Sequence, residues 1–176
     1  ARIVLDSINL VGDRLTTMEV TFPRCILAEF NTHRVFSRNS ASSRAIPVAK
    51  MLERVRKTPF VPIDAAWGKN QKGMQASEPL TVEERGQAVE LWLQARDYMV
   101  HFAAKLTDPE GLNVHKQIAN RLLEPFLWHT VIVTATMWDN FFNLRNHGAA
   151  EPHMQVIGAI MEGIYKQAPP PVQRHA

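Results

Sequence analysis

The chain has 176 residues, of which 45% are hydrophobic and 21% are charged, and its formal net charge is +3. This composition is typical of a folded globular protein and excludes an intrinsically disordered one. Cys25 is the single cysteine, which excludes an internal disulfide and a cysteine-rich zinc site. We therefore expect one domain over residues 1–176 in a reducing compartment, the cytoplasm. No apolar run approaches the ~20 residues that span a bilayer.

Hydrophobic periodicity predicts three strands and six helical segments. In chain order these are strands over 2–10 and 15–22, helices over 24–32, 47–58, 81–106 and 114–125, a strand over 128–135, and helices over 137–146 and 152–167. Alternation is clearest at Met18, Val20 and Phe22, which predicts a half-buried strand antiparallel to the one before it. We expect an α+β fold, with a small antiparallel sheet packed against several helices.

Capping residues predict where several helices begin and end. Thr81 followed by Glu84 forms a capping box at the start of the longest helix. Thr136 and Asp139 form a second capping pattern before the helix at 137–146. The three prolines at 169–171 are expected to end the last helix.

The apolar side chains of these helices predict how they pack. In the longest helix an apolar stripe has helical spacing, and we expect it to form the spine of the core. Its members are Ala88, Leu91, Trp92, Ala95, Tyr98, Met99, Phe102 and Leu106. Cys25 belongs to a short apolar helix with no base at a defined spacing, so we interpret it as a packing residue rather than a nucleophile.

Residues 31–47 form the most polar segment of the chain, with His33, Arg34, Arg38 and Arg44 set among serine and asparagine residues. Such a segment cannot be core, because burial of unpaired charge is costly. It is either a solvated basic loop or the lining of a site for an anionic ligand. Guanidinium groups favour the second interpretation, since they bind phosphate or carboxylate through two parallel hydrogen bonds.

Residues 59–80 contain three prolines and two glycines and have neither a helical nor a strand period. Connections of this length in a compact domain are usually functional or mobile. We interpret the segment as a loop or lid beside the substrate, with Trp67 and Lys69 as candidate contacts. The alternative is a surface loop that Trp67 packs against the rest of the chain.

Three segments resemble the flavin-dependent thymidylate synthases of the ThyX type. The family signature is Arg-His-Arg-x-x-Ser-x-Asn-Glu-x-Ser-x-Arg, and six of its eight fixed positions agree with this chain. The matching residues are His33, Arg34, Ser37, Asn39, Ser42 and Arg44. Residues 140–145 correspond to the family's Asn-Phe-Leu-x-Leu-Arg segment. Residues 119–125 resemble its Ala-Arg-x-x-Leu-Pro segment with one residue inserted, which makes Arg121 the substrate arginine.

The resemblance implies a ThyX-like fold and a reductive methylation. In that reaction FAD takes hydride from NADPH, methylenetetrahydrofolate supplies one carbon, and dUMP becomes dTMP. Arg145 is the implied catalytic residue, because its guanidinium stabilises negative charge as C5 of the pyrimidine becomes nucleophilic. The implied substrate contacts are Glu29, Ser40, Ser42, Arg44, Arg121 and Arg145. The implied FAD contacts are His33, Arg34, Ser37, Asn39 and Asn140. The resemblance also implies a homotetramer with shared active sites. From the sequence we expect neither a metal nor a membrane as partner, and a small-molecule nucleotide rather than a nucleic acid.

The chain departs from the family pattern at several positions. The signature's first arginine is Thr32 and its glutamate is Ser40, while a substrate-side glutamine is Glu29. Two flavin-side positions correspond to Thr134 and Thr136. The family also has an N-terminal segment that helps to hold flavin and folate, whereas about thirty residues precede His33 here. The segment 59–80 is a candidate to take its place.

Two alternatives to dUMP methylation stay open. If Glu29 reaches the base, its carboxylate would favour the amino group of cytosine, so that dCMP would receive a methyl or hydroxymethyl group. The other alternative is a non-catalytic nucleotide-binding or nucleic-acid-binding module. It would use Arg34, Arg38, Arg44 and Lys69 electrostatically.

Overall fold

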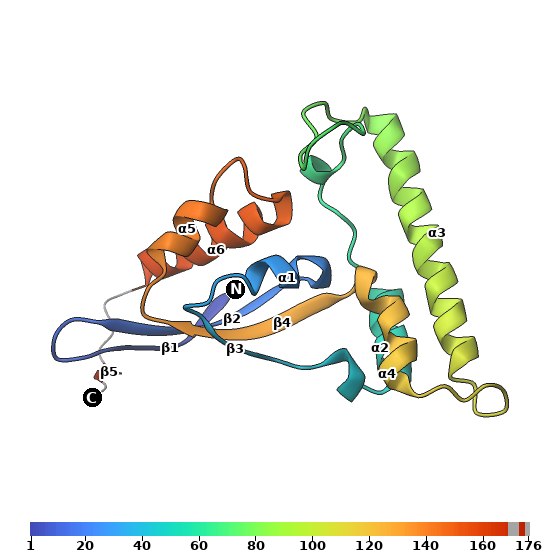
Figure 1. The fold of residues 1–176 in the computed structure, drawn as a ribbon, viewed down its shortest axis with the longest axis horizontal. Coiled ribbons are helices and arrows are strands. Elements are labelled where there is room, and N and C mark those ends of the chain that lie inside the picture. The colour runs from blue at the N-terminus through green and yellow to red at the C-terminus, as the bar shows by residue number, and fades with distance from the viewer. Residues whose placement is uncertain (169–172, 175–176) are drawn as a thin grey trace. The chain divides into compact units, whose positions relative to one another are not determined.

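The computed structural model describes residues 1–168 and 173–174, and the chain divides into two compact units (Figure 1). The first unit comprises Ala1–Phe22, Ile26–Ser40 and His129–Ala176, and the second comprises Pro23–Cys25 and Ala41–Trp128. Each unit has a hydrophobic core of its own. Two compact units can belong to one domain or to two, so the single domain expected from the sequence stays a prediction. Within the described residues, no helix has the length and apolar character needed to cross a bilayer.

The first unit is built on a sheet with the strand order β3-β4-β2-β1-β5. Its strands are β1 (Arg2–Ile8), β2 (Arg14–Pro23), β3 (Ser37–Ser40), β4 (Trp128–Ala135) and β5 (Gln173–Arg174). The predicted antiparallel pairing of the first two strands is confirmed. β3 was not predicted, because its residues are as polar as a loop. It pairs antiparallel with β4 and sets Ser37 opposite Thr134.

Three helices complete the first unit and cover one face of the sheet (Figure 1). They are α1 (Leu27–Phe30), α5 (Asp139–Arg145) and α6 (Pro152–Gln167). Met18, Val20 and Phe22 of β2 are buried against them, as their alternation predicts. The α+β fold with a small antiparallel sheet and several helices is confirmed.

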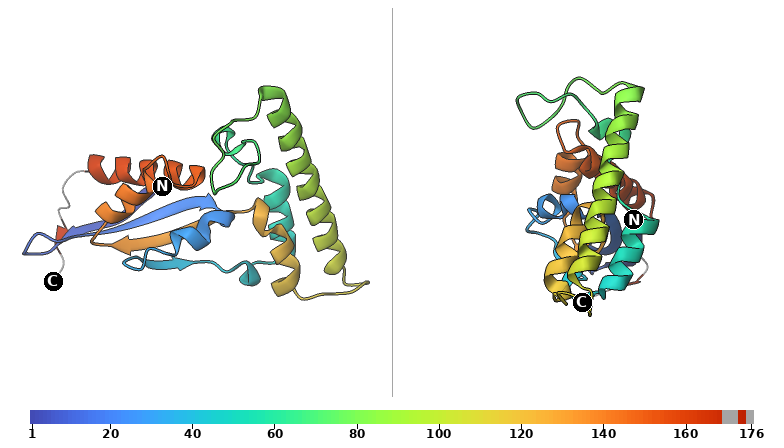
Figure 2. Two further views of the ribbon diagram at one scale, coloured as in Figure 1. Left: turned by 45° about the horizontal axis from the view of Figure 1, so that its top comes forward. Right: turned by 90° about the vertical axis from the view of Figure 1, so that its right-hand side faces the viewer.

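The second unit is helical. Its elements are α2 (Val48–Lys57), α3 (Val82–Leu106), α4 (Lys116–Ala119) and a 3-10 helix, Asn120–Phe126, that continues from α4. Figure 2 shows α2 and α4 beside α3 in both views. The predicted capping box at the start of α3 is confirmed, since the Glu84 amide donates to Thr81 Oγ1 over 3.2 Å and the Thr81 amide donates to Glu84 Oε2 over 2.9 Å.

The expected spine of the core is confirmed at Trp92 and Met99, which pack against the core of the second unit, and is wrong at three other large members of the stripe. Leu91, Tyr98 and Phe102 are 65%, 62% and 47% exposed in this chain. The helix instead buries the small side chains of Val100 and Ala103 against α2 and the 3-10 helix. The helical period was predicted, but the most buried positions are Val100 and Ala103, beside the predicted stripe.

Three further local expectations are corrected. Cys25 is exposed rather than packed inward, because the predicted helix at 24–32 begins as a 3-10 turn that buries Ile26 instead. The start of α5 has no side-chain cap from Thr136, since Trp138 occupies the capping position and its indole N–H donates to the Ala135 carbonyl over 3.1 Å. The predicted stop at prolines 169–171 lies outside the described residues.

Candidate functional site

Arg145, the last residue of α5, lies at the centre of a polar cluster in the first unit. Its Nε donates a hydrogen bond to His33 Nε2 over 2.8 Å, and its Nη2 donates to Thr32 Oγ1 over 3.2 Å. Its Nη1 forms an ion pair with the Glu29 carboxylate. A guanidinium has five N–H groups, so these three contacts leave two for a ligand. The cluster therefore holds a cation in a defined orientation with donors to spare.

His33 is buried beside this guanidinium. Its side chain packs edge-on against Phe141, with ring centroids 4.9 Å apart, and lies 5.6 Å from the ring of Phe36. Burial, together with the charges of Arg145 and Arg38, lowers the pKa of His33 to about 4. The imidazole is therefore neutral near pH 7. Because Nε2 accepts a hydrogen bond from Arg145, the ring proton is on Nδ1.

Arg38 fixes the backbone around His33. Its Nη1 donates to the carbonyl oxygens of Asn31 and His33, each over 2.9 Å, and to that of Phe30 over 3.4 Å. These bonds hold the turn that brings Thr32 and His33 to Arg145. The nucleic-acid alternative required Arg38 to face a polyanion, and its use inside the fold argues against that role.

The end of α5 is held in place by close helix packing. Phe141 and Phe142 anchor the helix in the core of the first unit. On the adjoining helix α6, a Cβ at Gly158 would lie 3.1 Å from the carbonyl carbon of Arg145 and 3.2 Å from its Cβ. A side chain at position 158 would require the end of α5 to shift by a few tenths of an ångström, so glycine allows the two helices to approach as closely as they do.

The residues implied to contact flavin divide into two kinds. Arg34, Ser37, Asn39 and Asn140 are exposed, and within residues 1–168 their side chains form no hydrogen bond or ion pair. Ser37 and Asn39 alternate along β3 and so point to the same face. These four side chains fit an exposed polar cofactor. His33 differs, because its Nε2 is already bonded to Arg145.

The departures from the family pattern also have defined positions. The hydroxyl of Thr134 lies 2.8 Å from that of Thr17, and the two form a hydrogen bond between β4 and β2. Thr136 is exposed beyond the end of β4. Thr32, which replaces an arginine of the signature, accepts a hydrogen bond from Arg145.

The second unit contains Ser42, Arg44 and Arg121, the three implied substrate contacts that the resemblance assigns to the nucleotide phosphate. Ser42 and Arg44 are exposed on the turn 42–46, where the Arg44 amide donates to Ser42 Oγ over 3.3 Å. Arg121 is 57% exposed, and its guanidinium lies 4.0 Å from the Glu124 carboxylate. That carboxylate also lies 3.7 Å from the guanidinium of Arg24, which was not predicted as a site residue. Ser40 is exposed at the end of β3, in the first unit.

The candidate contacts in the segment 59–80 have partners within the second unit. Lys69 forms an ion pair with Glu84, and the indole N–H of Trp67 donates to the Pro62 carbonyl over 3.1 Å. The Trp67 ring also packs edge-on against that of Trp92, with centroids 6.3 Å apart. These contacts agree with the alternative of a surface loop that Trp67 packs against the chain.

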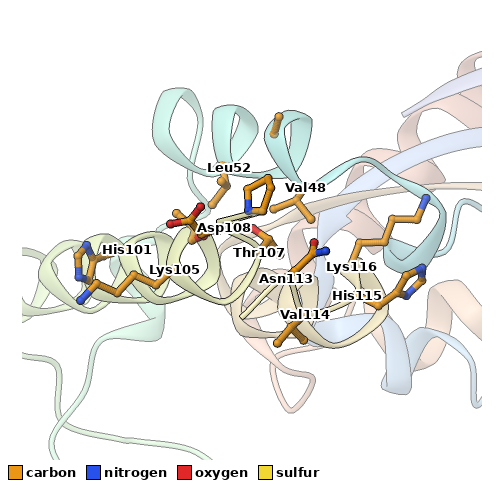
Figure 3. A pocket seen from close by; sticks show the side chains of 13 residues that line it. Val48, Leu52, His101, Lys105, Thr107, Asp108, Asn113, Val114, His115 and Lys116 are labelled. Atoms are coloured by element: carbon orange, nitrogen blue, oxygen red, sulfur yellow. Dashed lines mark hydrogen bonds between the residues drawn. The ribbon is translucent and has the colours of Figure 1, made fainter. Parts of the chain in front are cut away.

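A hollow of about 890 Å³ lies between α2, the end of α3 and the start of α4 (Figure 3). Figure 3 shows Leu52, Asp108 and Lys116 among its lining side chains. None of the residues predicted for the site line it. Within the described part of the chain, no group of three or more His, Cys, Asp or Glu residues could hold a metal ion.

The structure brings together Arg145 and Glu29, which the resemblance assigns to the substrate, and His33, which it assigns to the flavin. It adds Thr32 and Arg38 to the same cluster. Arg38 was visible in the sequence as one of the cations of the polar segment, but its bonds to three carbonyls had no local sequence signal. Thr32 was noted only as a departure from the signature.

No model of a known protein family matches the sequence, and no curated protein does either. Two crystal structures of the UMP/dUMP methylase PolB from Streptomyces cacaoi are similar to this chain. The structure bound with 5-Br UMP has a TM-score of 0.70 and 18% identity, covering 88% of this chain and 68% of that one. The structure bound with 5-Br dUMP has a TM-score of 0.69 and 17% identity, covering 88% and 66%.

A third similar structure is the flavin-dependent thymidylate synthase ThyX from Helicobacter pylori, complexed with FAD and dUMP. Its TM-score is 0.55 at 16% identity, covering 86% of this chain and 67% of that one. The chain has a ThyX-like fold. It spans about two thirds of the length of these structures. The fold expected from the three sequence segments is thus confirmed.

Proposed function

We propose that this chain is a ThyX-type enzyme that methylates dUMP to dTMP, with FAD as cofactor and with NADPH and methylenetetrahydrofolate as co-substrates. The observation that supports this most directly is the cluster at Arg145. A guanidinium from a late helix meets the first residues of the polar segment, and two of its N–H groups remain for a ligand. The ThyX-like fold agrees with this proposal.

In the proposed reaction, Arg145 contacts the pyrimidine base and stabilises negative charge as C5 becomes nucleophilic. A guanidinium keeps its charge at any working pH, so this stabilisation does not depend on protonation. His33 is neutral and accepts a hydrogen bond from Nε of Arg145, so it orients the guanidinium without competing for the negative charge. The proposed phosphate and sugar contacts are Ser40, Ser42, Arg44 and Arg121, with Glu29 on the substrate side.

The proposed flavin contacts are Arg34, Ser37, Asn39 and Asn140, together with His33. A bound flavin would supply the hydride for the reduction. The four exposed side chains offer both hydrogen-bond donors and acceptors and one cation, which suits a cofactor with polar ring edges and phosphates. The chain's own part is to hold this cofactor and the nucleotide in position.

The proposed enzyme is a homotetramer whose active sites are shared between subunits. Its proposed location is the cytoplasm. An exposed apolar stripe on α3 supports self-association, because Leu91, Tyr98 and Phe102 leave large apolar side chains uncovered in the single chain. Sedimentation of the purified protein tests this part, and a monomer at micromolar concentration would contradict it.

Glu29 favours dCMP as a second candidate substrate. Its carboxylate only accepts hydrogen bonds, and it lies beside the N–H groups of Arg145. Cytosine has a donating amino group where uracil has an accepting carbonyl. Turnover of dUMP and dCMP by the wild type and by Glu29→Gln separates the two substrates, and the products show whether a methyl or a hydroxymethyl group is added. An unchanged preference for dUMP in both proteins would exclude dCMP.

The cofactor part of the proposal is tested by spectroscopy. Purified protein is titrated with FAD, reduced with NADPH and reoxidised in air, and binding of dUMP is measured by calorimetry. We expect a flavin absorbance that NADPH bleaches and air restores, together with binding of dUMP. A protein that takes up neither FAD nor dUMP would contradict the proposal and favour the nucleic-acid-binding module, whose affinity should collapse as salt rises.

A further inference from the structure

The turn 42–46 is fixed by three side chains from one helical segment of the second unit. These are Lys116, Asn120 and Glu124, which follow one another at intervals of four residues along α4 and the 3-10 helix. Lys116 and Asn120 are about one α-helical turn apart, whereas Glu124 lies within the 3-10 helix, so what the three share is their bonding partner, the turn 42–46. All three form hydrogen bonds with residues of this turn.

Asn120 is the central member and is completely buried. Its Nδ2 donates to the carbonyl oxygen of Ser43 over 2.8 Å and to that of Ile46 over 2.9 Å, so it joins the two ends of the turn. A buried amide is costly unless it is bonded. These two bonds use both of its N–H groups, while its Oδ1 has no hydrogen-bond partner within the described residues.

The outer two members complete the attachment. Lys116 Nζ donates to the carbonyl oxygen of Ala45 over 3.1 Å. Glu124 Oε1 accepts a hydrogen bond from Ser43 Oγ over 2.7 Å. The backbone on either side of Arg44 is therefore held by side-chain bonds to three successive turns of one helical segment.

The Arg44 side chain itself is not held. It is exposed, and in the part of the chain that the structure describes no hydrogen bond or ion pair joins its guanidinium to another residue. A loop that is only solvated gains nothing from the buried Asn120 amide that fixes its backbone. A ligand site does gain, because a fixed backbone reduces the entropy that is lost when the Arg44 guanidinium binds a ligand.

The same helical segment also presents Arg121. Asn120 points inward to the turn, and the next residue, Arg121, is 57% exposed. These hydrogen bonds therefore attach the backbone of the Arg44 turn to the helical segment that carries Arg121. Guanidinium groups suit a phosphate, which accepts several hydrogen bonds at once.

We infer that Lys116, Asn120 and Glu124 are positioning residues that hold Ser42, Arg44 and Arg121 for the 5′-phosphate of the nucleotide. This inference rests on the proposed function and adds to it the residues that set phosphate recognition. They act through the turn and do not touch the ligand. Their loss should therefore weaken binding of a nucleotide but not of the corresponding nucleoside.

The test compares dUMP with deoxyuridine, which lacks the phosphate. Dissociation constants for both are measured by calorimetry with the wild type, Asn120→Leu and Lys116→Met. Leucine has the same number and branching of side-chain heavy atoms as asparagine and has no donor. We expect both variants to bind dUMP about tenfold more weakly while their affinity for deoxyuridine is unchanged.

Two controls separate positioning from folding. Lys116→Arg keeps a donor for the Ala45 carbonyl and should restore dUMP binding, and Gln117→Ala, at an exposed site in the same helix, should have no effect. If the folded variants bind dUMP as the wild type does, or lose affinity for dUMP and deoxyuridine equally, the inference is wrong. A wild-type protein that binds no dUMP would instead contradict the proposed function, and the inference with it.

Discussion

Acidification is expected to destabilise the chain through His33. The ring is buried beside the guanidinium groups of Arg145 and Arg38, and its pKa is lowered from 6.5 to about 4. Between these two values the unfolded chain binds a proton that the folded chain does not, so stability is lost as the pH falls through this window. Linkage then gives a loss of about 1 to 2 kcal/mol between pH 7 and pH 5.

Urea unfolding at the two pH values, followed by tryptophan fluorescence, measures this loss. The comparison is with His33→Gln, whose side chain can still accept the Arg145 hydrogen bond but does not titrate. Carboxylate groups titrate in both proteins, so their contribution cancels in the difference. His147→Gln, at an exposed histidine, should behave as the wild type does. If the free energy of unfolding falls by the same amount in the wild type and in His33→Gln between pH 7 and pH 5, the hypothesis that His33 is buried as a neutral imidazole is refuted.

Three other substitutions test separate parts of the account. Gly158→Ala places a methyl group 3.1 Å from the carbonyl carbon of Arg145 and should lower dUMP turnover, whereas Gly163→Ala, in the same helix with open space around its Cβ, should leave turnover unchanged. Arg145→Ala should lower kcat far more than it weakens dUMP binding, and Arg44→Ala should chiefly weaken binding; equal, mild effects in steady-state kinetics would contradict these roles. Glu84→Ala breaks the capping box of α3 and should lower Tm by a few degrees in a thermal scan, and an unchanged Tm would show that the cap adds no stability.

The features predicted from the sequence are those set by neighbouring residues. The alternation of Met18, Val20 and Phe22 predicted the buried face of β2 because a strand exposes successive side chains to opposite sides. The capping box of Thr81 and Glu84 spans three residues, so its geometry is local.

The features that could not be predicted depend on distant parts of the chain. The helical period of α3 is visible in the sequence, but the choice between Ala103 and Phe102 as the buried side depends on the surfaces of α2 and the 3-10 helix. The contact between Arg145 and Glu29 joins residues more than a hundred positions apart, and neither residue's neighbours indicate it. Arg38 has the same limitation, since a cation in a polar segment can equally face a ligand or its own backbone.

Strand β3 shows why composition alone misled the prediction for the polar segment. Its four residues, 37–40, are polar and were expected in a loop. They form a strand because β4 offers unpaired backbone groups along its side, and the register with β4 satisfies them. The exposed side chains of Ser37 and Asn39 then need no apolar partner.

The central claim is that Arg145 and the polar segment form the site of a flavin-dependent methylation of dUMP. Its most direct test is to incubate the protein with FAD, NADPH, methylenetetrahydrofolate and dUMP and to identify the nucleotide product by mass spectrometry. We expect dTMP from the wild type and at most a trace from Arg145→Ala. Unchanged dUMP after incubation with wild-type protein that binds both FAD and dUMP would contradict the account.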